Sequence, residues 1–190
     1  PDALYGLGCI QRLQGHLDAA ARSLDALLDA DGELPLRAVA TIERGRVSFD
    51  QGEFDRARAF FVAASKLEGV EAAECQYWLA KCDLRSDDAS AAASRLTQAI
   101  EANPNSPFTP EMMYDRAIAL LRTGDEAKSA AALREFLEKF KSHSLAPDAM
   151  ETLATIQHRA GRYDESARLC SAFLASYPGH ALAESVQFLA

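Results

Sequence analysis

The sequence predicts an all-α protein, an α-solenoid in which antiparallel helix hairpins stack in about five repeats plus a partial sixth. Three observations support this fold class. Alanine, the best helix former, supplies 37 of the 190 residues. Turn-forming residues recur at a nearly constant interval, and small side chains occupy the same two places in each interval. Short hairpins that repeat in this way bury their apolar faces only by stacking on one another.

Glycines mark the turns between the two helices of each hairpin. Gly15, Gly52, Gly124 and Gly161 each lie between two apolar helical patterns, at intervals of 37, 72 and 37 residues. The middle interval spans two units of about 36 residues, and Asp87 stands near its midpoint. Aspartate also tolerates turn conformations, so we expect Asp87 to replace the missing glycine.

Each unit has a small residue at its eighth and twentieth positions and a larger one at its twenty-fourth. The eighth position is held by Gly8, Gly45, Ala80, Ala117, Ala154 and Ala190. The twentieth is held by Ala20, Ala57, Ala92, Ser129 and Ser166. The twenty-fourth is held by Leu24, Phe61, Leu96, Leu133 and Cys170. Small residues let the two helices of a hairpin approach closely, and the twenty-fourth side chain fills the space beside them.

The prolines support the same unit boundaries. A proline inside a helix costs about 3 kcal/mol, so prolines collect between helices or in a first turn. Every proline of this chain falls at a unit boundary or at a helix start: Pro1, Pro35, Pro104, Pro107, Pro110, Pro147 and Pro178.

The first unit resembles the 34-residue tetratricopeptide repeat (TPR). The residues that carry the resemblance are Leu4, Leu7, Gly8, Gly15, Leu17, Ala20, Leu24 and Leu27. It covers nearly the whole chain as a single array, with repeats near 1–34, 38–69, 73–106, 110–143 and 147–180 and a partial repeat at 183–190. It implies a right-handed superhelix with a concave inner face. The sequence ends within an apolar pattern, so we expect the array to be a segment of a longer protein.

Five residues depart from the family pattern. Arg44 and Arg116 stand where the seventh position expects leucine, and Glu126 stands where the seventeenth expects an aromatic residue. Phe136 and Phe173 replace the small residue of the twenty-seventh position. We therefore expect the second and fourth units to pack less regularly than the others.

The fourth and fifth units share an ending. They close on Phe-Leu-Glu-Lys-Phe-Lys-Ser-His and on Phe-Leu-Ala-Ser-Tyr-Pro-Gly-His, each followed by a lead-in rich in leucine and alanine. This ending resembles the repeats of bacterial envelope proteins, such as the Tol–Pal-associated division coordinator and the lipoprotein of the β-barrel assembly machinery. The resemblance adds the bacterial periplasm or envelope to the cytoplasm as a location.

Composition and motifs argue against catalysis and against nucleic-acid binding. The net charge is −8, whereas phosphate binding needs clustered lysine and arginine. The sequence has no phosphate loop and no dinucleotide fingerprint, and its four histidines lack metal-ligand spacing. We predict no enzyme activity, no cofactor and no metal. No run approaches the roughly 20 apolar residues of a membrane-spanning helix, so no membrane insertion is expected.

The family resemblance implies that the first helix of each hairpin lines a concave groove, through positions 2, 5, 9, 12 and 13. The residues predicted to bind a partner there are Tyr5, Arg46, Tyr77, Lys81, Arg85, Tyr114, Arg122, His158 and Arg159. Tyrosine and arginine are enriched at binding hot spots, and arginine grips carboxylates with two hydrogen bonds. The alternative is that the tyrosines only pack and the basic residues are only solvated. Trp78 belongs either to the core or to the groove edge.

The sequence leaves three functions open. The first is a non-catalytic protein-interaction scaffold that binds a protein or peptide, with some acidic character, in its concave groove. The second is a structural module that self-associates, and the third is a regulatory arm of a larger enzyme or envelope complex. Binding of heat-shock-protein C-termini is not expected, because Tyr5 and Cys9 stand where that clamp has lysine and asparagine.

Overall fold

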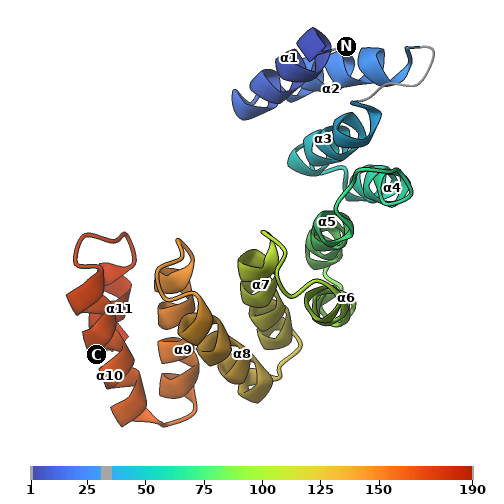
Figure 1. Ribbon diagram of the computed structural model, residues 1–190. Coiled ribbons are helices and arrows are strands. Elements are labelled where there is room, and N and C mark those ends of the chain that lie inside the picture. The colour runs from blue at the N-terminus through green and yellow to red at the C-terminus, as the bar shows by residue number, and fades with distance from the viewer. Residues whose placement is uncertain (1, 31–35, 190) are drawn as a thin grey trace. The chain divides into compact units, whose positions relative to one another are not determined.

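A computed structural model describes residues 2–30 and 36–189, and within these ranges the chain forms helices and no strands. The helices are α1 (Asp2–Leu13), α2 (Leu17–Leu28), α3 (Arg37–Asp50), α4 (Phe54–Ala64), α5 (Ala72–Arg85), α6 (Ala89–Ala102), α7 (Thr109–Arg122), α8 (Glu126–Lys139), α9 (Ala146–Arg159), α10 (Tyr163–Ser176) and α11 (Ala183–Leu189) (Figure 1). The predicted all-α class and the hairpin pattern are confirmed. Pro1, Pro35 and Ala190, which belong to the predicted repeat pattern, lie outside the described residues.

The chain divides into two compact units. Unit 1 comprises residues Pro1–Arg95 and unit 2 comprises Leu96–Ala190. Unit 1 thus holds α1 to α5 and the start of α6, and unit 2 holds the rest of α6 with α7 to α11. The expectation of a single array with no internal boundary stays a prediction.

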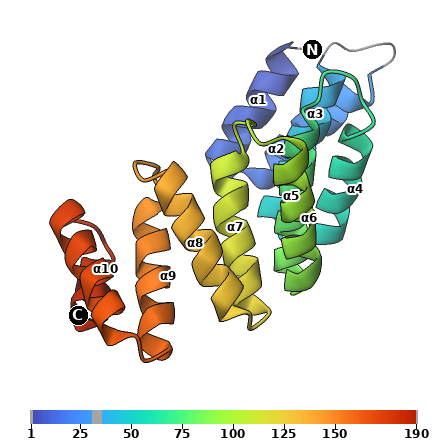
Figure 2. The same ribbon diagram turned by 60° about the horizontal axis from the view of Figure 1, so that its bottom comes forward.

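Within each unit the helices pack in the order that a solenoid requires. The two helices of a hairpin contact each other, as α1 with α2 and α3 with α4 in unit 1, and α7 with α8 and α9 with α10 in unit 2 (Figure 2). The second helix of a hairpin then contacts the first helix of the next, as α2 with α3 and α8 with α9. Each hairpin therefore buries the apolar face that it could not bury alone.

The turn residues adopt the backbone conformation that the spacing implied. Gly15, Gly52, Gly124 and Gly161 have φ values of 77°, 80°, 85° and 72°. Asp87 has a φ of 61° and is the non-glycine residue with positive φ among those described. The left-handed region costs a residue with a Cβ atom about 1–2 kcal/mol, somewhat less for aspartate. The prediction that Asp87 replaces a turn glycine is confirmed.

Two substitutions in this turn are expected to have opposite effects. Asp87→Gly should raise the free energy of unfolding by roughly 0.5–1 kcal/mol, because glycine adopts positive φ without steric cost. Asp88→Ala should lower it by about 1 kcal/mol, because the Asp88 carboxylate accepts a hydrogen bond at 2.9 Å from the Ala91 amide in the first turn of α6. Urea unfolding of both variants measures the two changes in the free energy of unfolding. Two changes of the same sign would contradict this account of the turn.

The small residues at the eighth position have the predicted role. A Cβ atom placed on Gly8 would lie 2.7 Å from Cγ of Leu24, and one on Gly45 would lie 2.7 Å from Cε1 of Phe61. Leu24 and Phe61 are fully buried and hold the twenty-fourth position of their repeats. The close approach of first and second helices in unit 1 thus depends on glycine opposite a large side chain.

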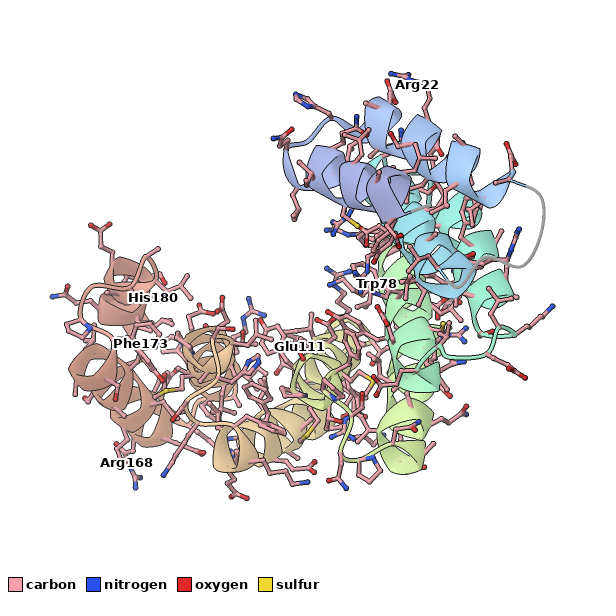
Figure 3. The ribbon with its side chains drawn as sticks, turned by 45° about the horizontal axis from the view of Figure 1, so that its top comes forward. Arg22, Trp78, Glu111, Arg168, Phe173 and His180 are labelled. Atoms are coloured by element: carbon pink, nitrogen blue, oxygen red, sulfur yellow. The ribbon has the colours of Figure 1, made fainter. Side chains whose placement is uncertain are left out.

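Ion pairs and aromatic packing accommodate departures from the repeat pattern. Arg44 has a side chain only 1% exposed, and its Nε atom donates to Oδ1 of Asp25 at 2.7 Å. Nη2 of Arg116 donates to Oε2 of Glu135 at 3.0 Å. Phe173 is buried, and its ring centre lies 5.8 Å from that of His180 (Figure 3). These contacts replace the apolar and small side chains that the family pattern expects.

Candidate functional site

The residues predicted to bind a partner lie on the first helices of the hairpins, in both units. In unit 1, α1 carries Tyr5, α3 carries Arg46, and α5 carries Tyr77, Lys81 and Arg85. We call the surface formed by the accessible parts of these three helices the first-helix face of unit 1. Tyr5 and Arg46 are half-buried, Arg85 is exposed, and Tyr77 is 9% exposed. Tyr77 is therefore largely buried, and its part in binding stays a prediction.

Five charged side chains from three helices form a continuous ladder on this face. Arg12 pairs with both Glu43 and Asp50, the second contact being 3.0 Å from Nη1 to Oδ2. Glu43 also accepts from Nη1 of Arg46 at 3.1 Å, and Nη2 of Arg46 pairs with Glu74. The Glu43 side chain is only 4% exposed. The Arg46 charge, which the sequence offered to a partner, is thus already balanced by two carboxylates of the chain.

Trp78, labelled on α5 in Figure 3, lies at the centre of an aromatic cluster with rings from α3, α4 and α5. Its ring stacks on that of Phe61, with ring centres 5.6 Å apart and an interplanar angle of 15°. Phe49 meets it edge-on at 5.5 Å, and Tyr77 lies tilted to it at 5.6 Å. Aromatic pairs in such geometries contribute about 0.5–1.5 kcal/mol beyond their buried area. We call Phe49, Phe61, Tyr77 and Trp78 the Trp78 cluster.

Three cations lie over rings of the Trp78 cluster. They are Arg46 over Trp78, Lys81 over Tyr77 and Arg85 over Phe49, with 5.2, 5.3 and 5.8 Å between cation and ring centre. Cation–π contacts within about 6 Å are favourable, more so where the cation is desolvated. The first-helix face of unit 1 therefore presents positive charge and aromatic surface together.

Tyr5 and Cys9 add a polar pair at the α1 end of this face. Burial and the neighbouring Cys9 raise the pKa of Tyr5 to about 12. Burial and the Glu43 carboxylate raise the pKa of the Cys9 thiol. Burial also raises the pKa of both Cys75 and Cys82 to about 11. These thiols are protonated at neutral pH, and a protonated thiol is a weak nucleophile.

In unit 2, the predicted tyrosine lies among acidic residues. Tyr114 on α7 is half-buried, and its pKa is raised by burial first and then by the charge of Asp148. Asp115 and Glu151 raise it further, and Thr152 on α9 forms a hydrogen bond with it. The sequence reasoning selected tyrosines and basic residues only, and it missed this concentration of carboxylates.

The basic residues predicted in unit 2 lie at the ends of two helices. Arg122 closes α7, and His158 and Arg159 close α9. All three are exposed, and the His158 ring meets the Tyr163 ring edge-on with centres 5.1 Å apart. They therefore stand at the C-terminal ends of α7 and α9, whereas Tyr114 lies in the first half of α7.

Residues 2–30 and 36–189 offer little other reactive chemistry. No group of three or more histidine, cysteine, aspartate or glutamate side chains in these ranges could hold a metal ion. All four cysteines are free. None of the helices described has the length and apolar character needed to cross a membrane.

Comparison with models of known protein families identifies the family of this chain. The profile of the tetratricopeptide repeat matches residues 5–67, 45–107, 79–141 and 114–181. The chain belongs to the tetratricopeptide repeat family. TPR proteins generally mediate protein–protein interactions, and TPR scaffolds are typically non-catalytic. No curated protein matches the chain at a significant level.

Solved TPR structures share the fold at low sequence identity. MamA is 21% identical with a TM-score of 0.72, and the match covers 89% of this chain and 93% of MamA. YrrB, described as a TPR protein with an unusual peptide-binding site, is 18% identical with a TM-score of 0.69, covering 97% and 90%. A thermophilic TPR protein from Thermus thermophilus is 18% identical with a TM-score of 0.70, covering 99% and 97%. These likenesses concern the fold alone.

The TPR register shows why sequence reasoning missed part of the unit 1 face. Glu43 and Trp78 both hold the sixth position of their repeats, which the predicted set left out. Arg12 and Glu74 hold the twelfth and second positions, which were considered, but neither was chosen. The available signal was charge alternation between successive repeats, from Arg12 through Glu43 and Arg46 to Glu74.

Proposed function

We propose that this TPR chain is a non-catalytic scaffold that binds a peptide segment of a partner protein along the first helices of its hairpins. The observation that carries the proposal is the Trp78 cluster with its three cations. Aromatic side chains and arginine are the residue types enriched at binding hot spots. The family's general role in protein interaction supports the proposal, as does the peptide-binding site named for YrrB.

The predicted acidic character of the partner applies to unit 1. Lys81 and Arg85 lie over aromatic rings there, and a carboxylate that approaches those rings would meet both cations. In unit 2, the carboxylates around Tyr114 disfavour an acidic segment on the corresponding face. We therefore assign the acidic part of the partner to the first-helix face of unit 1.

Self-association is a second candidate, supported by the apolar side of α1. Leu7, Ile10 and Leu13 are exposed there, and Leu13 is 77% exposed. Ile10 holds the tenth position of its repeat, and the residues at that position in the later repeats are buried: Val47, Cys82, Ala119 and Ile156. A helix from a second copy would cover this side as the preceding hairpin does elsewhere.

Selection from a displayed library of random peptides, with the chain immobilised, tests the scaffold proposal. We expect selected peptides to bind at least about tenfold more weakly to the double variant Lys81→Ala with Arg85→Ala, because both cations contact the proposed site. The control, Arg22→Ala with Lys66→Ala, removes the same charge from exposed positions outside the first helices and should change affinity less than about twofold.

Two outcomes would count against the scaffold proposal. One is a selection that yields no peptide, and the other is equal weakening by both double variants. Sedimentation of the unliganded chain at several concentrations separates the second candidate. A concentration-dependent dimer that Leu7→Ser with Ile10→Ser abolishes would favour self-association instead.

A further inference from the structure

Two buried nitrogen atoms on the first-helix face of unit 1 lack a hydrogen-bond acceptor among the described residues. They are Nε of Arg46 and Nε1 of Trp78. Buried N–H groups in native proteins are nearly always paired, so two orphan donors call for an explanation. The two groups are in contact, since Cζ of Arg46 lies 5.2 Å from the Trp78 ring centre. An acceptor supplied by a bound partner would satisfy donors that the chain itself leaves without one.

We propose that Arg46 and Trp78 form an anchor for a side-chain carboxylate of an acidic peptide segment. The anchor lies within the first-helix face of unit 1, so this inference rests on the proposed function and names the chemistry recognised there. A carboxylate matches the anchor because it accepts several hydrogen bonds and carries the charge that neighbouring cations attract. Both nitrogen atoms are covered in the unliganded chain, so the half-buried Arg46 and Trp78 side chains would shift to donate from Nε and Nε1 to the carboxylate.

The surroundings of the anchor favour a charged acceptor over a neutral one. Lys81 and Arg85 lie over the rings of Tyr77 and Phe49, and both rings contact Trp78. A carboxylate at the anchor would therefore have Lys81 and Arg85 nearby in addition to Arg46, whose own charge Glu43 and Glu74 balance. The half-buried rings of Phe49 and Trp78 offer apolar surface to the residues that flank the carboxylate in the peptide. We infer a segment in which aspartate or glutamate alternates with aromatic or leucine side chains.

The ion pairs of Arg46 with Glu43 and Glu74 determine which of its nitrogen atoms remains for the partner. Nη1 and Nη2 already donate to Glu43 and Glu74, so Nε is the guanidinium nitrogen without an acceptor among the described residues. Burial raises the pKa of Glu74, so its charged form is less favoured than in water, although Arg46 opposes this shift. Glu74 is half-buried and lies on the same guanidinium, so it competes with an incoming carboxylate.

Trp78 is the single tryptophan of the chain, so its emission reports on this site alone. The probe is a synthetic capped peptide in which aspartate and glutamate alternate with phenylalanine and leucine. Its control has asparagine and glutamine in place of the acids and keeps the apolar residues. We expect the acidic peptide to change Trp78 emission saturably and to bind about tenfold more tightly than the amide control.

Three conservative variants, read by anisotropy of a dye on the acidic peptide, test the anchor. Arg46→Lys keeps the charge but lacks Nε, and Trp78→Phe keeps an aromatic ring but lacks the N–H group. Each should weaken binding about fivefold or more. Glu74→Gln removes the competing carboxylate and should strengthen binding about threefold. A residue that only supports the fold would produce no such gain. Circular dichroism melts check that each variant is folded.

The outcomes separate this inference from the function on which it rests. Equal binding of the acidic and amide peptides would overturn the anchor, as would unchanged affinity in both Arg46→Lys and Trp78→Phe. If library peptides still bind and still depend on Lys81 and Arg85, the proposed function stands while the anchor fails. If no library peptide binds the chain at all, the proposed function fails first.

Discussion

Phe136→Ala is expected to lower the free energy of unfolding by about 4 kcal/mol, since truncation of buried phenylalanine costs about 3–5 kcal/mol. Phe136 is fully buried in the core of unit 2, where its ring centre lies 6.1 Å from that of Tyr114 and 5.8 Å from that of Phe140. The neighbouring His143 ring meets it edge-on at 6.0 Å. Removing the ring leaves a cavity between α7, α8 and α9 that rigid helices can fill only in part.

The measurement is a urea or thermal unfolding curve beside that of Phe188→Ala. Phe188 is 92% exposed on α11, so its truncation removes the same atoms without a cavity and should change stability by less than about 0.5 kcal/mol. For a chain of this size, about 4 kcal/mol corresponds to a drop of roughly 8–16 °C in Tm. A Phe136→Ala protein as stable as its Phe188→Ala control would contradict the core described for unit 2.

Hydrogen exchange should localise the effect of Phe136→Ala. In repeat proteins each hairpin contacts mainly its neighbours, so a defect weakens the adjoining hairpins most. Protection is therefore expected to fall most in α7 to α9, and least in α1 and α2.

The fold could be predicted from sequence because its signals are local and repeated. Gly15, Gly52, Gly124 and Gly161 gave the period, and Asp87 could be placed by counting although it is not a glycine. The approach of Gly8 to Leu24 and of Gly45 to Phe61 also follows from position in the repeat alone. Repetition provides several independent tests of one pattern, so single departures do not obscure it.

The site was less predictable because it depends on which side chains meet across neighbouring hairpins. Position in the repeat gave Arg46 as a surface cation, but the partners that neutralise it, Glu43 and Glu74, come from its own helix and from α5. Burial of Tyr77 to 9% exposure depends on the neighbouring rings, as does the central place of Trp78. Two orphan nitrogen atoms can be recognised only once every neighbour is placed.

The second large expected effect concerns the ion pair between Arg44 and Asp25. Asp25→Ala is expected to lower the free energy of unfolding by about 3 kcal/mol, the lower end for breaking a buried pair, since Asp25 is itself 40% exposed. The variant would leave the Arg44 charge almost fully buried, with its Nη1 contact to Ser48 Oγ at 2.8 Å as the remaining hydrogen bond to a side chain. An unpaired buried charge is far more costly than an absent one.

Arg44→Leu therefore provides the informative comparison, because it restores the residue that the TPR pattern expects at this position. It removes the buried charge along with the ion pair, and leucine fills part of the same volume, so we expect a change within about 1 kcal/mol of the parent chain. In the double variant Arg44→Leu with Asp25→Ala, the cost of Asp25→Ala should largely disappear. A double-mutant cycle by urea unfolding measures this coupling. If Asp25→Ala costs the same in both backgrounds, the carboxylate acts independently of Arg44, and the ion pair does not explain how this repeat accommodates arginine in place of leucine.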